Sequence, residues 1–100
     1  MIVIAGRMKI DPAKLQHALD IIKPVVEQTA TESGNVAYRY YADLDDPSTL
    51  FIFEEWQSEA ALDNHFQMPY MVDFLEKIPT LGILDASVHR YGVADKILMG

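Results

Sequence analysis

Two side chains that could take part in a reaction lie close together in this sequence. Trp56 ends a β-rich apolar stretch, and His65 follows it in a segment with helical character. An imidazole, with an ordinary pKa near 6.5, can accept a proton at neutral pH. An indole can stack on a flat aromatic molecule. We therefore predict one apolar pocket in which His65 accepts a substrate proton and Trp56 contacts the substrate.

These residues also have plain structural alternatives. A histidine in the last turn of a helix can satisfy free carbonyl groups and the helix dipole, and a buried Trp often only fills a core. Glu54 shares the strand face of Trp56, so it could orient His65 or accept a proton if burial raises its pKa. An ion pair between Glu54 and either Arg7 or Arg39 is equally compatible with the sequence.

Other aromatic and apolar side chains are candidates for the pocket lining. Helical spacing puts Phe66 on the same side as His65. Tyr40 lies on one face of a predicted strand, but strand alternation leaves open whether that face meets the helices or a partner chain. Side chains near a predicted helix break could form an adaptable lid or belong to the core of the next helix. The predicted substrate contacts are Trp56, Tyr40, Phe66, Met68 and Tyr70.

Composition excludes several classes of function. The net charge of -7 and the scattered Lys and Arg residues disfavour nucleic acid and anionic membrane partners. The chain has no cysteine, its three histidines lack metal-ligand spacing, and it has no Gly-rich phosphate loop. We expect neither a metal nor a cofactor. No targeting segment or long apolar stretch is evident, so the cytoplasm is the expected location.

The elements that must position these residues can be predicted from local patterns. Strands are expected at Ile2–Ile10, Val36–Tyr41, Leu50–Trp56 and Ile83–Tyr91. A first helix begins at Asp11-Pro12, contains Pro24 as a site of kinking, and ends at a left-handed Gly34-Asn35. Ser58 caps a second helix, which Met68-Pro69 breaks into a third that ends near Pro79. The Asp-rich connection from Ala42 to Thr49 is interpreted as a turn and not as a calcium loop.

This order predicts one α+β domain over residues 1–100, a ferredoxin-like split β-α-β arrangement with a four-stranded antiparallel sheet. Its third strand is apolar on both faces. Leu50, Ile52 and Trp56 point one way, while Phe51 and Phe53 point the other. Because helices on one side cover only one face, the other would be an exposed apolar patch. We therefore expect a homodimer in which two sheets face each other.

The sequence resembles the antibiotic biosynthesis monooxygenase superfamily of dimeric α+β barrels. The resemblance rests on the segment EEWQSEAALDNH at residues 54–65, on Met68-Pro69-Tyr70, and on Gly34-Asn35 with Tyr38-Arg39-Tyr40. It implies a pocket between helices and sheet in each subunit. The haem-degrading branch has an Asn near the end of the first strand and a Trp on the second helix, where this chain has Gly6 and His65. Its axial histidine would fall at Leu75, so haem degradation is disfavoured.

The resemblance implies a cofactor-independent monooxygenase that oxidises a small phenolic, quinol or anthrone-like compound with molecular oxygen. Electron-rich phenolates and carbanions can reduce oxygen without a cofactor. His65 would be the proton acceptor, with Glu54 as a second catalytic residue. Two alternatives remain open at this point: a cofactor-free isomerase on the same scaffold, and a small-molecule-binding dimer that performs no reaction.

Overall fold

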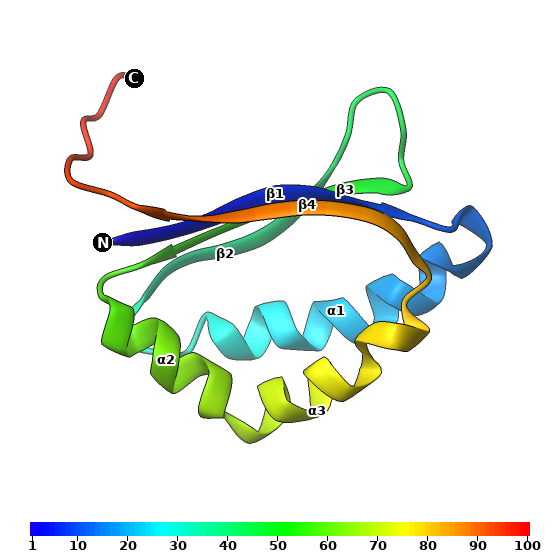
Figure 1. The fold of residues 1–100 in the computed structure, drawn as a ribbon, viewed down its shortest axis with the longest axis horizontal. Coiled ribbons are helices and arrows are strands. Elements are labelled where there is room, and N and C mark those ends of the chain that lie inside the picture. The colour runs from blue at the N-terminus through cyan, green and yellow to red at the C-terminus, as the bar shows by residue number, and fades with distance from the viewer.

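The computed structural model describes residues 1–100 as one antiparallel sheet with all helices on one face (Figure 1). The strands are β1 (Ile2–Ile10), β2 (Asn35–Ala42), β3 (Thr49–Trp56) and β4 (Ile83–Gly92). The helices are α1 (Leu15–Thr29), α2 (Glu59–Gln67) and α3 (Pro69–Lys77), with short 3-10 turns at Pro12–Lys14 and Ile78–Thr80. The predicted order of elements is confirmed.

The strands pair in the spatial order β2-β3-β1-β4, and every pairing is antiparallel. The helical connection from β1 to β2 passes over β3, and the connection from β3 to β4 passes over β1. This is the ferredoxin-like arrangement predicted from the sequence. The register places Tyr38 opposite Glu54 and Glu54 opposite Ile4. Directly paired residues share a face, so the candidate site residues of β2 and β3 all point toward the helices.

The start of α1 follows the prediction, whereas its end does not. The Asp11 side chain accepts a hydrogen bond from the backbone of Ala13 at 3.0 Å, and Pro24 lies inside a continuous helix. The helix ends at Thr29, before the predicted stop, and Gly34 does not have positive φ. Gly34 is required for another reason: an added Cβ would come within 2.3 Å of the Ala61 side chain. This glycine allows the turn after α1 to approach α2.

The connections around α2 and β3 follow local chemistry. Ser58 accepts a hydrogen bond from the backbone of Ala61 at 3.1 Å and so caps α2. Met68 adopts an extended conformation between α2 and α3, which confirms the predicted break. In the β2–β3 connection, Asp46 accepts hydrogen bonds from Lys9, Ser48 and Thr49. These bonds lower the pKa of Asp46. Both of its carboxylate oxygens thus accept hydrogen bonds that stabilise the turn.

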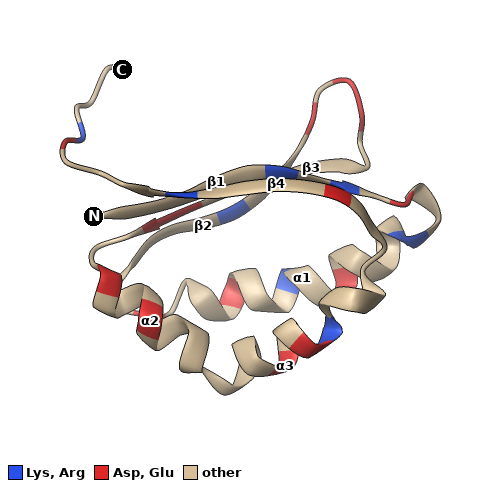
Figure 2. Ribbon diagram, viewed as in Figure 1, with Lys and Arg blue, Asp and Glu red and all other residues tan.

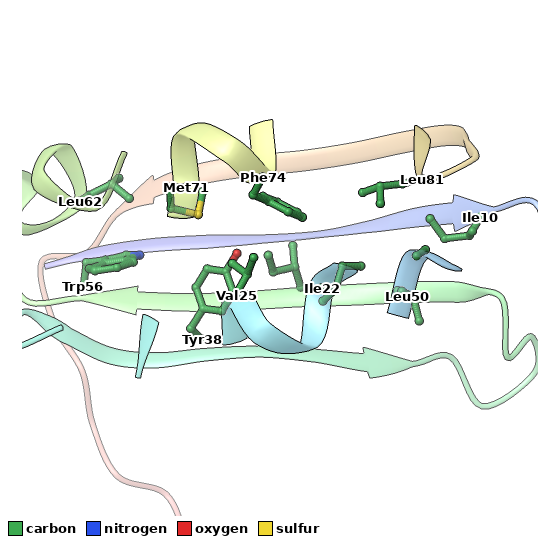
Figure 3. Close-up of a cluster of buried hydrophobic side chains, with 12 residues drawn as sticks. Ile10, Ile22, Val25, Tyr38, Leu50, Trp56, Leu62, Met71, Phe74 and Leu81 are labelled. Atoms are coloured by element: carbon green, nitrogen blue, oxygen red, sulfur yellow. The ribbon is translucent and has the colours of Figure 1, made fainter. Parts of the chain in front are cut away.

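The core is a single apolar layer between the sheet and the helices (Figure 3). Trp56 and Leu62 lie at one end of this layer, and Ile10, Leu50 and Leu81 lie at the other. No helix covers the opposite face of the sheet (Figure 1), where Lys96 of the C-terminal segment bonds to Glu55 at 2.8 Å. Phe51 is 43% exposed there. The prediction that β3 is apolar on both faces is therefore confirmed.

Charge is distributed without a concentrated basic surface (Figure 2). Acidic side chains lie on all three helices and in the β2–β3 connection, while Lys and Arg are scattered along the strands and helices. None of the helices combines the length and the hydrophobicity that a membrane-spanning helix requires.

Candidate functional site

His65 lies near the end of α2 and is almost completely buried, with 1% of its surface exposed. Three aromatic rings from other elements surround its imidazole. The ring centroids lie 4.6 Å from Trp56, 5.6 Å from Tyr38 and 6.2 Å from Tyr70. The predicted juxtaposition of His65 and Trp56 is thus present. The helix places His65 on the side of Leu62, which is also buried, because residues three apart share a helical face.

Glu32 is the nearest acid–base partner of His65, and it was not predicted from the sequence. It lies in the turn after α1, and its Oε2 is 2.7 Å from Nδ1 of His65. The hydroxyl of Tyr70 donates a hydrogen bond to the same oxygen, and it is 3.3 Å from the hydroxyl of Thr29. The side chain of Glu32 is 6% exposed. One carboxylate oxygen therefore joins α2, α3 and the end of α1.

Burial keeps the Tyr70 hydroxyl protonated, with the hydrogen bond to Glu32 acting in the same direction. Together they raise the pKa of Tyr70 to about 12. A protonated phenol can donate to Glu32 throughout the neutral range. The nitrogen Nε2 of His65, by contrast, makes no hydrogen bond within the chain. The imidazole is thus held at one nitrogen and is unpaired at the other.

Glu54 does not orient His65, whereas its predicted role as a proton acceptor stays a prediction. Its Oε1 accepts a hydrogen bond of 3.0 Å from Nε1 of Trp56, and it bonds neither to His65 nor to an arginine. Arg7 lies on the uncovered sheet face beside Asp85, and Arg39 also points to that face, since both alternate with residues that face the helices. Burial raises the pKa of Glu54 to about 7, although the bond from Trp56 opposes this shift.

The two tyrosines of β2 lie on the helix side of the sheet, which answers the question that strand alternation left open. Tyr38 is buried, and Tyr40 is half-buried with its ring 5.9 Å from that of Tyr38. Burial, together with neighbouring Tyr40 and Glu54, raises the pKa of Tyr38 far above its ordinary value. Burial raises the pKa of Tyr40 to about 12. Both hydroxyls are therefore protonated at neutral pH.

Phe66 is more accessible than predicted, and Met68 is half-buried. Phe66 follows His65 directly and points away from the core, with 43% of its surface exposed and its ring 5.5 Å from the imidazole. Adjacent helical residues differ by about 100° in direction, which accounts for the contrast between them. Met68 is half-buried between α2 and α3. Tyr70 is the predicted contact that joins the hydrogen-bonded group at His65.

No cleft of the structure is lined by His65 or Trp56. An open, mostly polar cleft of about 570 Å³ lies between the turn after α1 and the start of α2. It reaches Glu32 from outside, and Met68 lies at its wall. A smaller cleft of about 150 Å³ between α1 and α3 reaches Tyr70. The predicted pocket is therefore filled by the chain's own side chains, and a substrate ring could reach His65 only if neighbouring side chains move.

The family model for antibiotic biosynthesis monooxygenase matches residues 1–77, which include every residue of this candidate site. The chain belongs to the antibiotic biosynthesis monooxygenase family. This assignment confirms the resemblance that was based on the segment from Glu54 to His65. Family membership makes oxidation of a small molecule a possible activity of the fold, whereas the substrate has to be argued from the site.

Two relatives in sequence do not define a substrate. An uncharacterized protein of Synechocystis is 35% identical over 94 residues, which are 94% of this chain and 64% of the relative. This chain thus spans less than two thirds of that protein. The candidate monooxygenase YcnE of Bacillus subtilis is 27% identical over 77 residues, which cover 77% of this chain and 81% of YcnE.

Solved structures confirm the fold. A candidate antibiotic biosynthesis monooxygenase from Deinococcus radiodurans superposes with a TM-score of 0.87 at 22% identity, covering 100% of both chains. Another antibiotic biosynthesis monooxygenase has a TM-score of 0.82 at 25% identity, covering 95% of this chain and 100% of the other. The similarity in fold extends to β4, beyond the residues that the family model matches.

Proposed function

We propose that the chain is a cofactor-independent monooxygenase that oxidises a small phenolic, quinol or anthrone-like compound with molecular oxygen. The observation that carries this proposal is a buried imidazole with an unpaired Nε2 among the rings of Trp56 and Tyr38. Such a nitrogen can remove a proton from an aromatic substrate that binds against it. The family and the name of YcnE agree with this class of reaction.

The proposed chemistry balances without a cofactor. For an anthrone-like substrate, His65 removes a proton from the reacting CH₂ group and leaves a carbanion stabilised by the rings. The carbanion transfers one electron to oxygen, and the radical pair combines into a peroxide. Loss of water then leaves a ketone. One oxygen atom enters the product, and the other leaves as water with the two hydrogens of the CH₂ group.

Binding requires the site to open, since the rings around His65 are packed together. Phe66 is the most accessible ring beside the imidazole, and Met68 has a flexible side chain at the break between α2 and α3. We propose that these side chains move to admit the substrate ring against Trp56. Tyr40, protonated at neutral pH, would then be available as a hydrogen-bond donor to a quinol or ketone oxygen, while Tyr70 lines the site and donates to Glu32.

Oxygen consumption by the purified, metal-stripped protein tests this function. The substrates are a panel of reduced quinols and anthrones, each compared with its spontaneous rate. Saturable uptake is expected, with one oxygen atom from ¹⁸O₂ incorporated into the product and the other released as water. Conversion of a substrate under nitrogen would instead indicate an isomerase. Recovery of a bound compound unchanged after aerobic incubation would indicate a binding protein, and either result would contradict the monooxygenase.

We also propose that the working form is a homodimer that buries the uncovered sheet face. Three aromatic side chains there are about half exposed: Tyr41 at 54%, Phe51 at 43% and Tyr91 at 45%. They lie on β2, β3 and β4, and Arg7 of β1 lies on the same face, directly opposite Phe51. A second copy of the same face would cover it symmetrically.

Substitution Phe51→Glu is expected to weaken dimer formation by roughly 10²-fold or more. The change removes an apolar contact and places two carboxylates in a symmetric interface of an acidic protein. Sedimentation equilibrium measures the result. Leu44→Glu is the matched control, because Leu44 is fully exposed in the β2–β3 connection and should leave the dimer unchanged. A wild-type mass of 11.3 kDa at micromolar concentration would contradict the proposed dimer.

A further inference from the structure

We infer that Glu32 is a positioning residue that selects the reactive tautomer of His65, and that Tyr70 supports it. The inference rests on the proposed function of His65, and it assigns a role to a residue on a different element. Glu32 and His65 are separated by 33 positions in the chain, yet Oε2 and Nδ1 lie 2.7 Å apart. With 1% and 6% of their side chains exposed, the pair is shielded from solvent.

The arrangement of donors defines the protonation state of the imidazole. Oε2 of Glu32 accepts the hydroxyl hydrogen of Tyr70, and the same oxygen faces Nδ1 of His65. An ionised carboxylate can only accept hydrogen bonds, so Nδ1 must carry the hydrogen in that bond. A neutral His65 then has an unprotonated Nε2. This nitrogen is the one without a partner in the chain, and it is therefore the proton acceptor.

Glu32 also stabilises the product of proton transfer. When Nε2 accepts a proton, the imidazole becomes positively charged in a site that contains no Lys or Arg contact. An adjacent carboxylate compensates that charge, which water cannot do at a buried position. Tyr70 donates to the carboxylate from α3 and limits the directions in which it can turn. A carboxylate acting on a histidine in this way is a known arrangement in acyl-transfer enzymes.

The tautomer of His65 can be measured independently of any substrate. In protein labelled with ¹⁵N at histidine, protonated and unprotonated ring nitrogens resonate well apart, and the His65 signals are assigned by their absence in His65→Gln. We expect Nδ1 protonated and Nε2 unprotonated in the neutral wild-type ring. Observation of the opposite tautomer in the wild type would overturn the inference without any Glu32 variant.

Glu32→Met removes both acceptor oxygens and the charge with little change in volume. The Nε2-protonated tautomer is expected to become dominant, and kcat is expected to fall by at least ~10²-fold. Glu32→Gln retains one acceptor oxygen without the charge and should give an intermediate kcat. Tyr70→Phe leaves the carboxylate in place, so the wild-type tautomer should persist. Glu27→Met, at an exposed position of α1, is the matched control with unchanged tautomer and rate.

Two combinations of results separate this inference from the proposed function. If Glu32→Met retains the wild-type tautomer and full oxygen uptake while His65→Gln is inactive, the role of Glu32 is wrong and the function stands. If the wild-type protein consumes no oxygen but its tautomer responds to Glu32→Met as expected, the positioning role is supported and the monooxygenase is wrong.

Discussion

Turnover is expected to fall by about 10³-fold when His65 is replaced by Gln. General-base catalysis contributes ~10²–10⁴-fold to enzymatic rates, and no other group at the site combines an unpaired nitrogen with ring contacts to Trp56 and Tyr38. The Gln side chain retains polar atoms that can bond to Glu32, so the packing between α2 and the turn after α1 should persist. The loss should appear in kcat, measured as oxygen uptake at saturating substrate.

The other two histidines provide matched controls. His17 and His89 are exposed, and His17 contacts only the hydroxyl of Thr80 at 3.2 Å. Their substitution by Gln should leave oxygen uptake unchanged. Circular dichroism and sedimentation should show a folded His65→Gln protein with the wild-type mass. If this folded variant keeps more than a tenth of the wild-type kcat, His65 does not act as the general base.

Stability at alkaline pH should increase when Glu54 is replaced by Gln. The folded-state pKa of Glu54 is about 7, whereas its ordinary value is 4.5. The folded protein therefore binds the proton more tightly than the unfolded chain, and its stability decreases as pH rises from 4.5 to 7. This difference in pKa corresponds to a loss of about 3 kcal/mol in the free energy of unfolding once Glu54 is fully ionised in the folded protein. Gln is neutral and can still accept the hydrogen bond from Trp56.

Urea unfolding at pH 5 and pH 8 measures this effect. The difference in unfolding free energy between Glu54→Gln and the wild type should be roughly 2 kcal/mol larger at pH 8 than at pH 5. Glu76→Gln is the control, since Glu76 is an exposed residue of α3 and makes no side-chain hydrogen bond or ion pair. If the variant and the wild type differ in unfolding free energy by the same amount at both pH values, the pKa of Glu54 is the same in the folded and unfolded states, which would contradict this prediction.

A titratable Glu54 would also affect the proposed reaction. Below pH 7 its protonated carboxyl is a neutral neighbour of Trp56, whereas above pH 7 it adds a negative charge to the site. A negative charge near the reacting ring disfavours formation of a carbanion or phenolate. The two carboxylates at the site therefore differ in their contacts. Glu32 bonds to His65, and Glu54 bonds to Trp56 beside it.

Local patterns were sufficient for the order of the elements and for the fold. Asp11 and Ser58 cap helical segments through their own side chains, and Met68-Pro69 interrupts the helical backbone. These effects depend on neighbours within a few residues, so they can be predicted from one sequence. Alternation along β3 likewise showed that Trp56 and Glu54 share a face, because side-chain direction in a strand has a period of two. Gly34 was misinterpreted because the approach of Ala61 that requires it comes from a distant part of the chain.

The sequence by itself determined the family, the ferredoxin-like fold, and the placement of His65 beside Trp56. Only the tertiary structure revealed that Glu32, and not Glu54, bonds to the imidazole, and that Phe66 is exposed. Glu32 lies in a turn without periodicity, where no local pattern defines the direction of a side chain. Its contact with His65 depends on how α1 and α2 pack on the same sheet face, and this packing is set by the whole core.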